Sequence, residues 1–164
     1  MTIDTIRFFR GELRRSLHGP AWHGPALLEA LGDVTVSEAF HRPESGAHSI
    51  AELAVHAVAW MEEVERRLGG SEPAEPERGD WPSPGKRSQA NWDALRALVE
   101  ATGNSLDARM ASFKSEHLLD KVGSGIHNAP LGSGVPYIVM LNGVIQHNVY
   151  HAGQVVLLKK EQRA

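Results

Sequence analysis

Three histidines lie at positions where helical periodicity places them among apolar residues. His147 and His151 are four residues apart, and on a helix this spacing puts their Cβ atoms about 5 to 6 Å apart on one face. His56 lies in a separate apolar stripe of helical period. Imidazole nitrogen is a suitable ligand for Zn, Ni, Fe or Cu, and three such ligands leave coordination positions open for water or substrate. We therefore interpret His56, His147 and His151 as the ligands of one metal ion.

The competing interpretations are chance and a purely structural role. Nine histidines in 164 residues give roughly half of one i,i+4 pair by chance, so the pair alone is weak evidence. A single histidine on an apolar face is also more commonly a hydrogen-bonded structural residue. Three buried imidazoles, however, are costly unless they share a partner, and one metal ion is such a partner for all three. The segment HNVYH lacks the glutamate of the H-E-x-x-H motif, which argues against a zinc protease.

The catalytic acid or base is left open by the sequence. His127 lies in a Gly-rich segment and has the chemistry to act over the metal, although a solvated loop residue is the commoner case. Glu52 lies one turn before His56, where it can support the ligand through a hydrogen bond, but a helix-capping role explains it better. His23 and His48 are expected to be solvated.

The composition indicates one globular domain covering residues 1–164. Hydrophobic residues make up 41% of the chain and charged residues 23%, which is ordinary for a chain that folds. The 17 basic and 20 acidic residues leave a net charge of only −3, so nucleic acid is not an expected partner. No stretch approaches the roughly 18 apolar residues of a membrane span, so we expect a cytoplasmic protein with no membrane partner. The absence of cysteine excludes disulfides and thiolate ligands.

The elements that would position the histidines are helices, which makes the expected fold class all-α. Ser49 and Glu52 form a capping-box signature before His56, and Pro136 suits the first turn of the segment that carries the histidine pair. Several prolines without an apolar period predict a long irregular connection over residues 71–90, of the kind that often forms a lid or binding loop. Apolar residues recur with helical spacing over residues 3–17, 26–31, 49–68, 92–113 (as one helix or two) and 136–158.

Three further residues receive structural interpretations. Gly153 costs about 1 kcal/mol relative to alanine inside the last predicted helix, which indicates close helix packing or room near the metal, and we favour packing. Trp22 and Trp60 are large enough to line a pocket, but aromatic residues on apolar faces usually belong to the core. We assign neither tryptophan a chemical role.

The chain resembles the DinB/YfiT-like proteins, which carry a histidine in the second main helix and an H-x-x-x-H pair in the last. The resemblance implies a four-helix bundle of up-down-down-up order, frequently dimeric, with the family's metal ligands at His56, His147 and His151. The matching segments are PAWHGPALLEAL (20–31), RPESGAHSIAELAVHAVAWM (42–61) and MLNGVIQHNVYHAGQVVLLKK (140–160).

The resemblance also implies two enzyme activities, metal-dependent hydrolysis and S-transfer with a low-molecular-weight thiol. The expected cofactor is a divalent metal, Zn or Ni ahead of Fe or Mn, and no other cofactor is expected. The expected partners are a small-molecule substrate, a low-molecular-weight thiol in the S-transferase version, and a second copy in a homodimer. The alternative is a non-catalytic helical bundle that binds a metal or a small ligand.

Overall fold

The computed structural model of the chain describes residues 4–123 and 131–164. In these ranges all regular structure is helical apart from one isolated bridge between Lys121 and Pro136, which confirms the expected all-α class. No helix in the described part is both long enough and apolar enough to cross a membrane. The elements are α1 (Thr5–His18), α2 (Leu27–Gly32), α3 (Val36–Phe40), α4 (Ile50–Leu68), α5 (Gln89–Ser112), the short 3-10 helix η1 (Ser115–His117) and α6 (Tyr137–Gln162).

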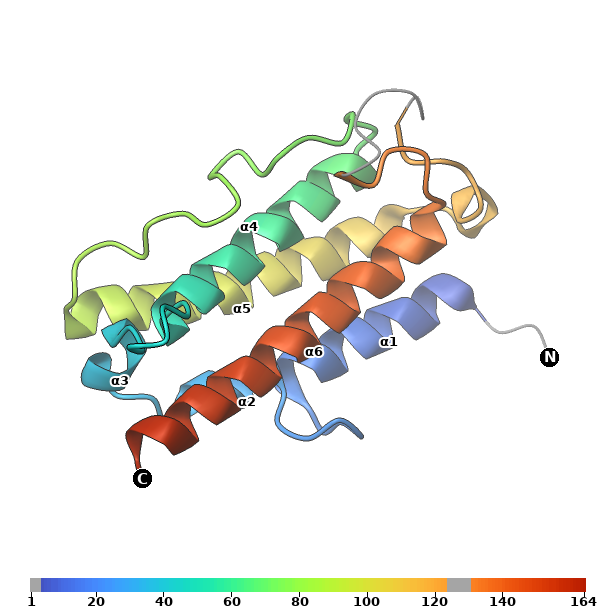
Figure 1. Cartoon of the computed structure of the whole chain (residues 1–164). Helices are drawn as coiled ribbons and strands as arrows, with labels where there is room; N and C mark the ends of the chain where they lie inside the picture. Colours follow the sequence, from blue (N-terminus) through green and yellow to red (C-terminus); the bar gives the residue numbers. More distant parts are fainter. Residues whose placement is uncertain (1–3, 124–130) are drawn as a thin grey trace.

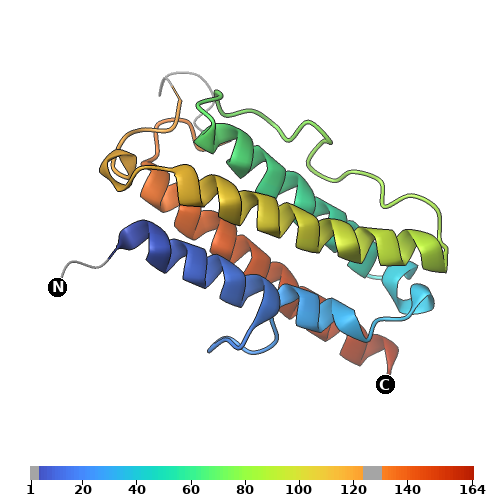
Figure 2. The ribbon, with the colours of Figure 1, turned by 180° about the vertical axis from the view of Figure 1, so that it is seen from behind.

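The four long helices, α1, α4, α5 and α6, lie side by side (Figure 1). α1 and α6 run in one direction, and α4 and α5 run in the opposite direction, as the view from behind also shows (Figure 2). α4 packs against α5 and α6, and α1 packs against the same two helices. Two neighbouring pairs, α4 with α5 and α1 with α6, are therefore parallel.

When the next long helix in the chain runs parallel to the one before it, the connection between them must run back along the first helix. α4 has 19 residues, which is about 28 Å of helix at 1.5 Å per residue. Residues 69–88 form this connection, and they run along the outside of α4 without regular structure (Figure 1). The predicted long irregular connection is confirmed, and we call residues 69–88 the return segment.

A buried carboxylate anchors the first part of the return segment to α4. Glu63 is 2% exposed and accepts hydrogen bonds of 2.6 to 3.0 Å from the side chains of Arg66 and Arg67 and from the backbone N–H of Ala74. Charge-assisted hydrogen bonds of this kind are stronger than neutral ones and geometrically specific. The chain therefore turns back over α4 from a fixed point.

Local sequence signals account for where the helices begin. The hydroxyl of Ser49 accepts a hydrogen bond from the N–H of Glu52, and the Glu52 carboxylate accepts one from the N–H of Ser49, so the predicted capping box is confirmed. Thr35 and Glu38 form a second box at the start of α3. The periodicity prediction omits α3, although its T-x-x-E signature is present in the sequence. α5 is one continuous helix, which decides between the one-helix and two-helix alternatives.

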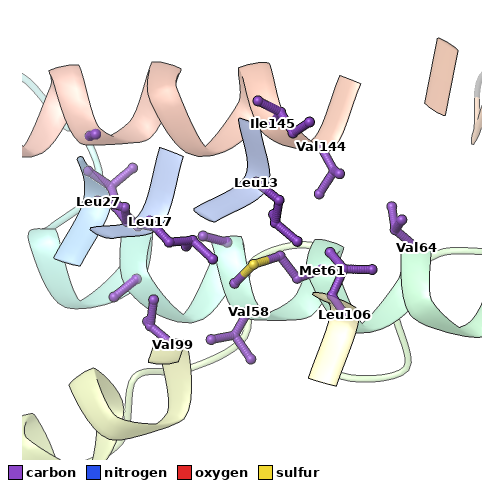
Figure 3. Packing of buried hydrophobic residues seen from close by; sticks show 14 of the residues in the cluster. Leu13, Leu17, Leu27, Val58, Met61, Val64, Val99, Leu106, Val144 and Ile145 are labelled. Carbon is purple, nitrogen blue, oxygen red and sulfur yellow. The ribbon is translucent and has the colours of Figure 1, made fainter. Parts of the chain in front are cut away.

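The core fills the space between the long helices (Figure 3). Leu13 of α1, Met61 of α4, Leu106 of α5 and Leu141 of α6 are all fully buried. Burying one such side chain contributes about 1.5 to 3 kcal/mol. Every long helix is therefore held by apolar contacts that do not involve the histidines.

Two glycines inside long helices have different surroundings. A Cβ atom at Gly103 of α5 would lie 2.4 Å from Cδ1 of Leu17, a buried residue of α1. A Cβ atom at Gly153 of α6 would meet nothing within 4 Å. The expectation that Gly153 permits close helix packing is therefore wrong, and it is Gly103 that permits a close approach, between α1 and α5.

These surroundings predict opposite effects of the same substitution. Gly153→Ala should raise the free energy of unfolding by about 0.5 to 1 kcal/mol, because alanine is the better helix former. Gly103→Ala gains the same propensity but should lower the free energy of unfolding by about 1 kcal/mol overall, because the added methyl group overpacks Leu17. Urea unfolding of both variants measures the difference, and equal effects would contradict the close approach of α1 and α5.

Candidate metal centre

The three predicted ligands meet between α4 and α6. His56 lies on α4, and His147 and His151 lie on successive turns of α6. Nε2 of His147 is 3.0 Å from Nε2 of His56 and 3.0 Å from Nε2 of His151, and all three ligand nitrogens lie within 4.8 Å of one another. His56 and His151 are 5% and 3% exposed, and His147 is half-buried. The structure thus brings together the residues that the sequence singled out.

The hydrogen bonds on the outer side of the cluster determine which ring nitrogens carry a proton. Nδ1 of His56 lies 2.6 Å from the backbone carbonyl of Asp80, and Nδ1 of His151 lies 2.6 Å from the side-chain oxygen of Gln154. Both partners can only accept, so both Nδ1 atoms are donors. In a neutral imidazole the other nitrogen then carries a lone pair. His56 and His151 therefore both direct a lone pair towards His147.

A neutral cluster cannot satisfy these contacts. If Nε2 of His147 carries a proton, it can donate that proton to Nε2 of only one neighbour, His56 or His151. The Nε2 atom of the other neighbour then lies 3.0 Å away with no hydrogen directed along the contact. If Nε2 of His147 is unprotonated, three lone pairs face one another. Nδ1 of His147 is itself buried without a hydrogen-bond partner among the described residues. A positive charge shared by the three Nε2 atoms would satisfy all of these contacts.

A divalent metal ion fits this requirement. Two imidazole nitrogens bound to one zinc ion at about 2.0 to 2.1 Å lie about 3.3 Å apart at a tetrahedral angle, close to the two distances of 3.0 Å in the cluster. Metal-bound histidines usually donate their second N–H to a carbonyl or carboxylate, as His56 and His151 do here. The three histidines therefore form a group that could hold a metal ion.

Burial keeps the imidazoles in the form that binds metal. Loss of solvent, together with repulsion between neighbouring positive charges, lowers the pKa of His147 from 6.5 to about 3. Burial also lowers the pKa of His151 to about 4, against the opposing effect of its hydrogen bond to Gln154. It lowers the pKa of His56 as well. At neutral pH all three rings are therefore uncharged, as ligation requires.

The return segment completes the site with two residues that the sequence analysis missed. The ring of Trp81 stacks on that of His56, with centroids 3.8 Å apart and planes 6° apart, and it stacks on His48 in the same way at 3.5 Å. The Asp80 carboxylate accepts a hydrogen bond of 2.7 Å from the indole N–H of Trp60. The expectation of a binding loop pointed to this segment, but no local pattern distinguishes these two residues within it.

Other candidate residues lie in different surroundings from those expected. His48 is half-buried against Trp81 and not simply solvated, whereas His23 is exposed as expected. Glu52 caps α4 and pairs with Arg42 at 2.9 Å, so the capping role is confirmed. His127 lies outside the described residues.

Trp22 and Trp60 do not occupy the core positions expected for them, whereas Asn148 is buried. Trp22 belongs neither to the core nor to a pocket wall, because it is fully exposed. Trp60 is half-buried and lines a cavity beside His56 and His147. Asn148 occupies the place of the glutamate in H-E-x-x-H, but it is fully buried and its amide contacts the sulfur of Met61 at 3.6 Å. That position therefore faces the core, in agreement with the argument against a zinc protease.

The chain matches the sequence model of a known family. The sequence model of the DinB superfamily matches residues 21–155, a range that includes all three histidines of the cluster. No curated protein and no solved structure gave a significant match to the chain.

The buried neutral histidines predict a pH-dependent stability in metal-free protein. In the unfolded chain the imidazoles take up protons near pH 6.5, whereas in the folded chain His147 and His151 stay neutral until the pH approaches about 3 and about 4. The unfolded state therefore binds more protons as the pH falls below 6.5. Between pH 7 and pH 5 the free energy of unfolding should fall by about 2 kcal/mol for each of these two rings.

Urea unfolding at pH 7, 6 and 5, followed by circular dichroism, measures this loss. The variant His147→Gln serves as the control, because it removes one of the two rings and should lose about 2 kcal/mol less than the wild type over the same range. A wild-type stability that is constant from pH 7 to pH 5 would show that the rings are not held neutral by burial.

Proposed function

The chain belongs to the DinB superfamily, and from this membership and the geometry of the three histidines we propose that it is a metal-dependent enzyme acting on a small molecule. His56, His147 and His151 would hold one divalent ion, with Zn or Ni preferred to Fe or Mn. The observation that carries the proposal is the convergence of the three Nε2 atoms, with His147 only 3.0 Å from each of the others. Such a cluster is unsatisfied without a shared cation.

The four long helices support a finer proposal about the fold. We propose that they form the up-down-down-up bundle that the resemblance implies. The directions of α1, α4, α5 and α6 (Figures 1 and 2) and the packing of α4 and α1 against the other two helices support this order. In such a bundle, side chains on facing helices commonly build the metal site.

The chain's own residues would orient the ligands and shield the ion. The Asp80 carbonyl and the Gln154 side chain hold the rings of His56 and His151 with their Nε2 atoms inward, and Trp81 covers one face of His56. When bound, a divalent ion with three protein ligands supplies Lewis acidity, which polarises a substrate and lowers the pKa of a bound water or thiol towards neutrality. The Asp80 carboxylate lines the same cavity as His147 and is available to accept a proton there.

Hydrolysis and thiol transfer both follow from this chemistry. Hydrolysis needs only water as the second reactant. Thiol transfer needs a free low-molecular-weight thiol, because the chain has no cysteine of its own. A screen of ester, amide and thiol substrates with the metal-loaded protein would separate the two reactions, and the alternative of a non-catalytic metal-binding protein predicts no turnover with any of them.

Metal content is the first test of the proposal. Elemental mass spectrometry of the purified protein, after incubation with Zn, Ni, Fe or Mn salts, should find one ion per chain. His56→Ala and His147→Ala should each lose it, because two remaining imidazoles bind far more weakly than three. His117→Ala is the matched control, because His117 pairs with Asp120 on the surface, and it should retain the ion.

One outcome of this test and two outcomes of chelating the ion bear directly on the function. No stoichiometric metal in the wild type would overturn the proposal and leave three structural histidines. Chelation that removes turnover but leaves the helical circular-dichroism signal would support a functional ion. Chelation that unfolds the chain would instead indicate a structural ion, an outcome that the apolar contacts of every long helix make unexpected.

The hydrogen bond from His151 to Gln154 predicts a smaller, graded effect. Gln154→Leu should weaken metal binding about 10- to 100-fold, because the ring of His151 loses the acceptor that sets its tautomer and orientation. Gln146→Leu is the control, since Gln146 lies on the same helix but is exposed. Zinc competition against a chromophoric chelator measures both affinities, and equal affinities would show that the acceptor does not support the site.

A further inference from the structure

A cavity of about 460 Å³ adjoins the histidine cluster. His56 and His147 form part of its wall, and its other lining residues come mainly from α4, from α6 and from the chain just before α6. The volume falls in the range of about 300 to 1,000 Å³ that is usual for small-molecule sites. The apolar side chains of the wall are Trp60, Val64, Val135, Met140 and Val144.

The apolar wall is built by the two facing helices. Val64 extends from α4 towards α6, and Val144 extends from α6 towards α4 (Figure 3). The indole ring of Trp60 is held in place by its hydrogen bond to Asp80. A tryptophan fixed at its polar edge presents its apolar faces to a neighbouring ligand.

The positive side chain in the cavity wall, Arg67, is already paired within the protein. Arg67 is 4% exposed, and it donates hydrogen bonds to the Glu63 carboxylate at 2.6 Å and to the carbonyls of Leu131 and Ala74 at 2.8 and 3.0 Å. All three nitrogens of its guanidinium group are therefore engaged within the protein. Arg67 does not provide a free binding group for an anionic ligand.

The negative side chain in the cavity wall, Asp80, also disfavours an anionic ligand. The Asp80 carboxylate lines the cavity and lies 3.4 Å from Nδ1 of His56. A ligand carboxylate or phosphate in the cavity would be repelled by this like charge. A cationic ligand would approach the positive ion of the proposed metal centre, and the wall offers an anion no free cationic side chain, because Arg67 is engaged within the protein. The mostly apolar wall therefore favours a ligand whose bulk is uncharged.

We propose that this cavity binds the uncharged, apolar part of the substrate and directs its reacting end to His56 and His147. The inference rests on the proposed function, because His56 and His147 of the cluster form part of the cavity wall. It also restricts the thiol version of that function. A low-molecular-weight thiol that carries several charged groups does not match this wall, whereas a neutral alkyl or aryl compound does.

Gly143 offers a way to fill the cavity without disturbing the fold. It lies on α6 and lines the cavity, and a Cβ atom built on it would meet nothing within 4 Å. Gly143→Leu should therefore place an apolar side chain into the space that the ligand would occupy. The replacement of a helical glycine also favours the helix. Loss of ligand in this variant cannot then be attributed to unfolding.

The test uses the uncharged fluorophore N-phenyl-1-naphthylamine and its sulfonated analogue, 8-anilino-1-naphthalenesulfonate. Fluorescence titration of the full chain is carried out in both the metal-free and the zinc-loaded state. The uncharged probe should bind the wild type, and at least tenfold more tightly than the sulfonated probe in metal-free protein. Gly143→Leu should weaken binding of the uncharged probe at least tenfold while leaving the zinc content and the circular-dichroism spectrum unchanged.

Gly153→Leu is the matched control. Gly153 lies on the same helix with equally open surroundings, but it lines a different hollow beside Tyr150 and Leu157, and its substitution should not change the affinity for the uncharged probe. Equal binding by the wild type and Gly143→Leu, or loss of binding in Gly153→Leu alone, would overturn the inference. So would tighter binding of the sulfonated probe to metal-free protein. Because zinc content is measured separately, failure of the cavity and failure of the metal site are distinguishable.

Discussion

The parallel course of α4 and α5 is the constraint on which the site depends. Because α5 is the next long helix after α4 and runs in the same direction, the segment between them must run back along the length of α4. Here that segment is residues 69–88, which start from the anchor at Glu63 and pass over His56. An antiparallel neighbour joined by a tight turn would leave this face of α4 open to solvent. The chain connection therefore supplies both the Asp80 carbonyl and the Trp81 ring to the histidine cluster.

The histidine cluster in turn combines the effect of burial with that of its outer hydrogen bonds. Removal of water lowers the pKa of the imidazoles and keeps them neutral, while the outer hydrogen bonds of His56 and His151 direct their lone pairs inward. Neutral imidazole nitrogens that converge in a largely buried site are in the form that binds a metal cation. The cavity next to the cluster offers a ligand a mostly apolar wall. The burial that is costly for three imidazoles alone would strengthen the chemistry of an ion bound to them.

Much of the fold and the core of the site could be predicted from local patterns. Helical periodicity and the capping box at Ser49 identify the helix that carries His56, and a spacing of four residues is sufficient to place His147 and His151 on one face of another helix. The Pro-rich composition of the connection predicts that it is long and irregular. Local patterns misjudged Gly153, because helix propensity reveals the cost of a glycine but not its surroundings, which the packing of neighbouring helices decides.

What the sequence by itself determined is therefore the set of helices and the residues on each helical face, because both depend on interactions within a few positions of the chain. Only the tertiary structure decided that α4 and α6 face each other at the histidines, that Asp80 and Trp81 reach His56, and that Arg67 donates to the carbonyl of Leu131 beside an apolar cavity. These contacts join residues 24 to 91 positions apart. They depend on the direction in which each helix runs and on the path between helices, and no local pattern of residue types encodes either one.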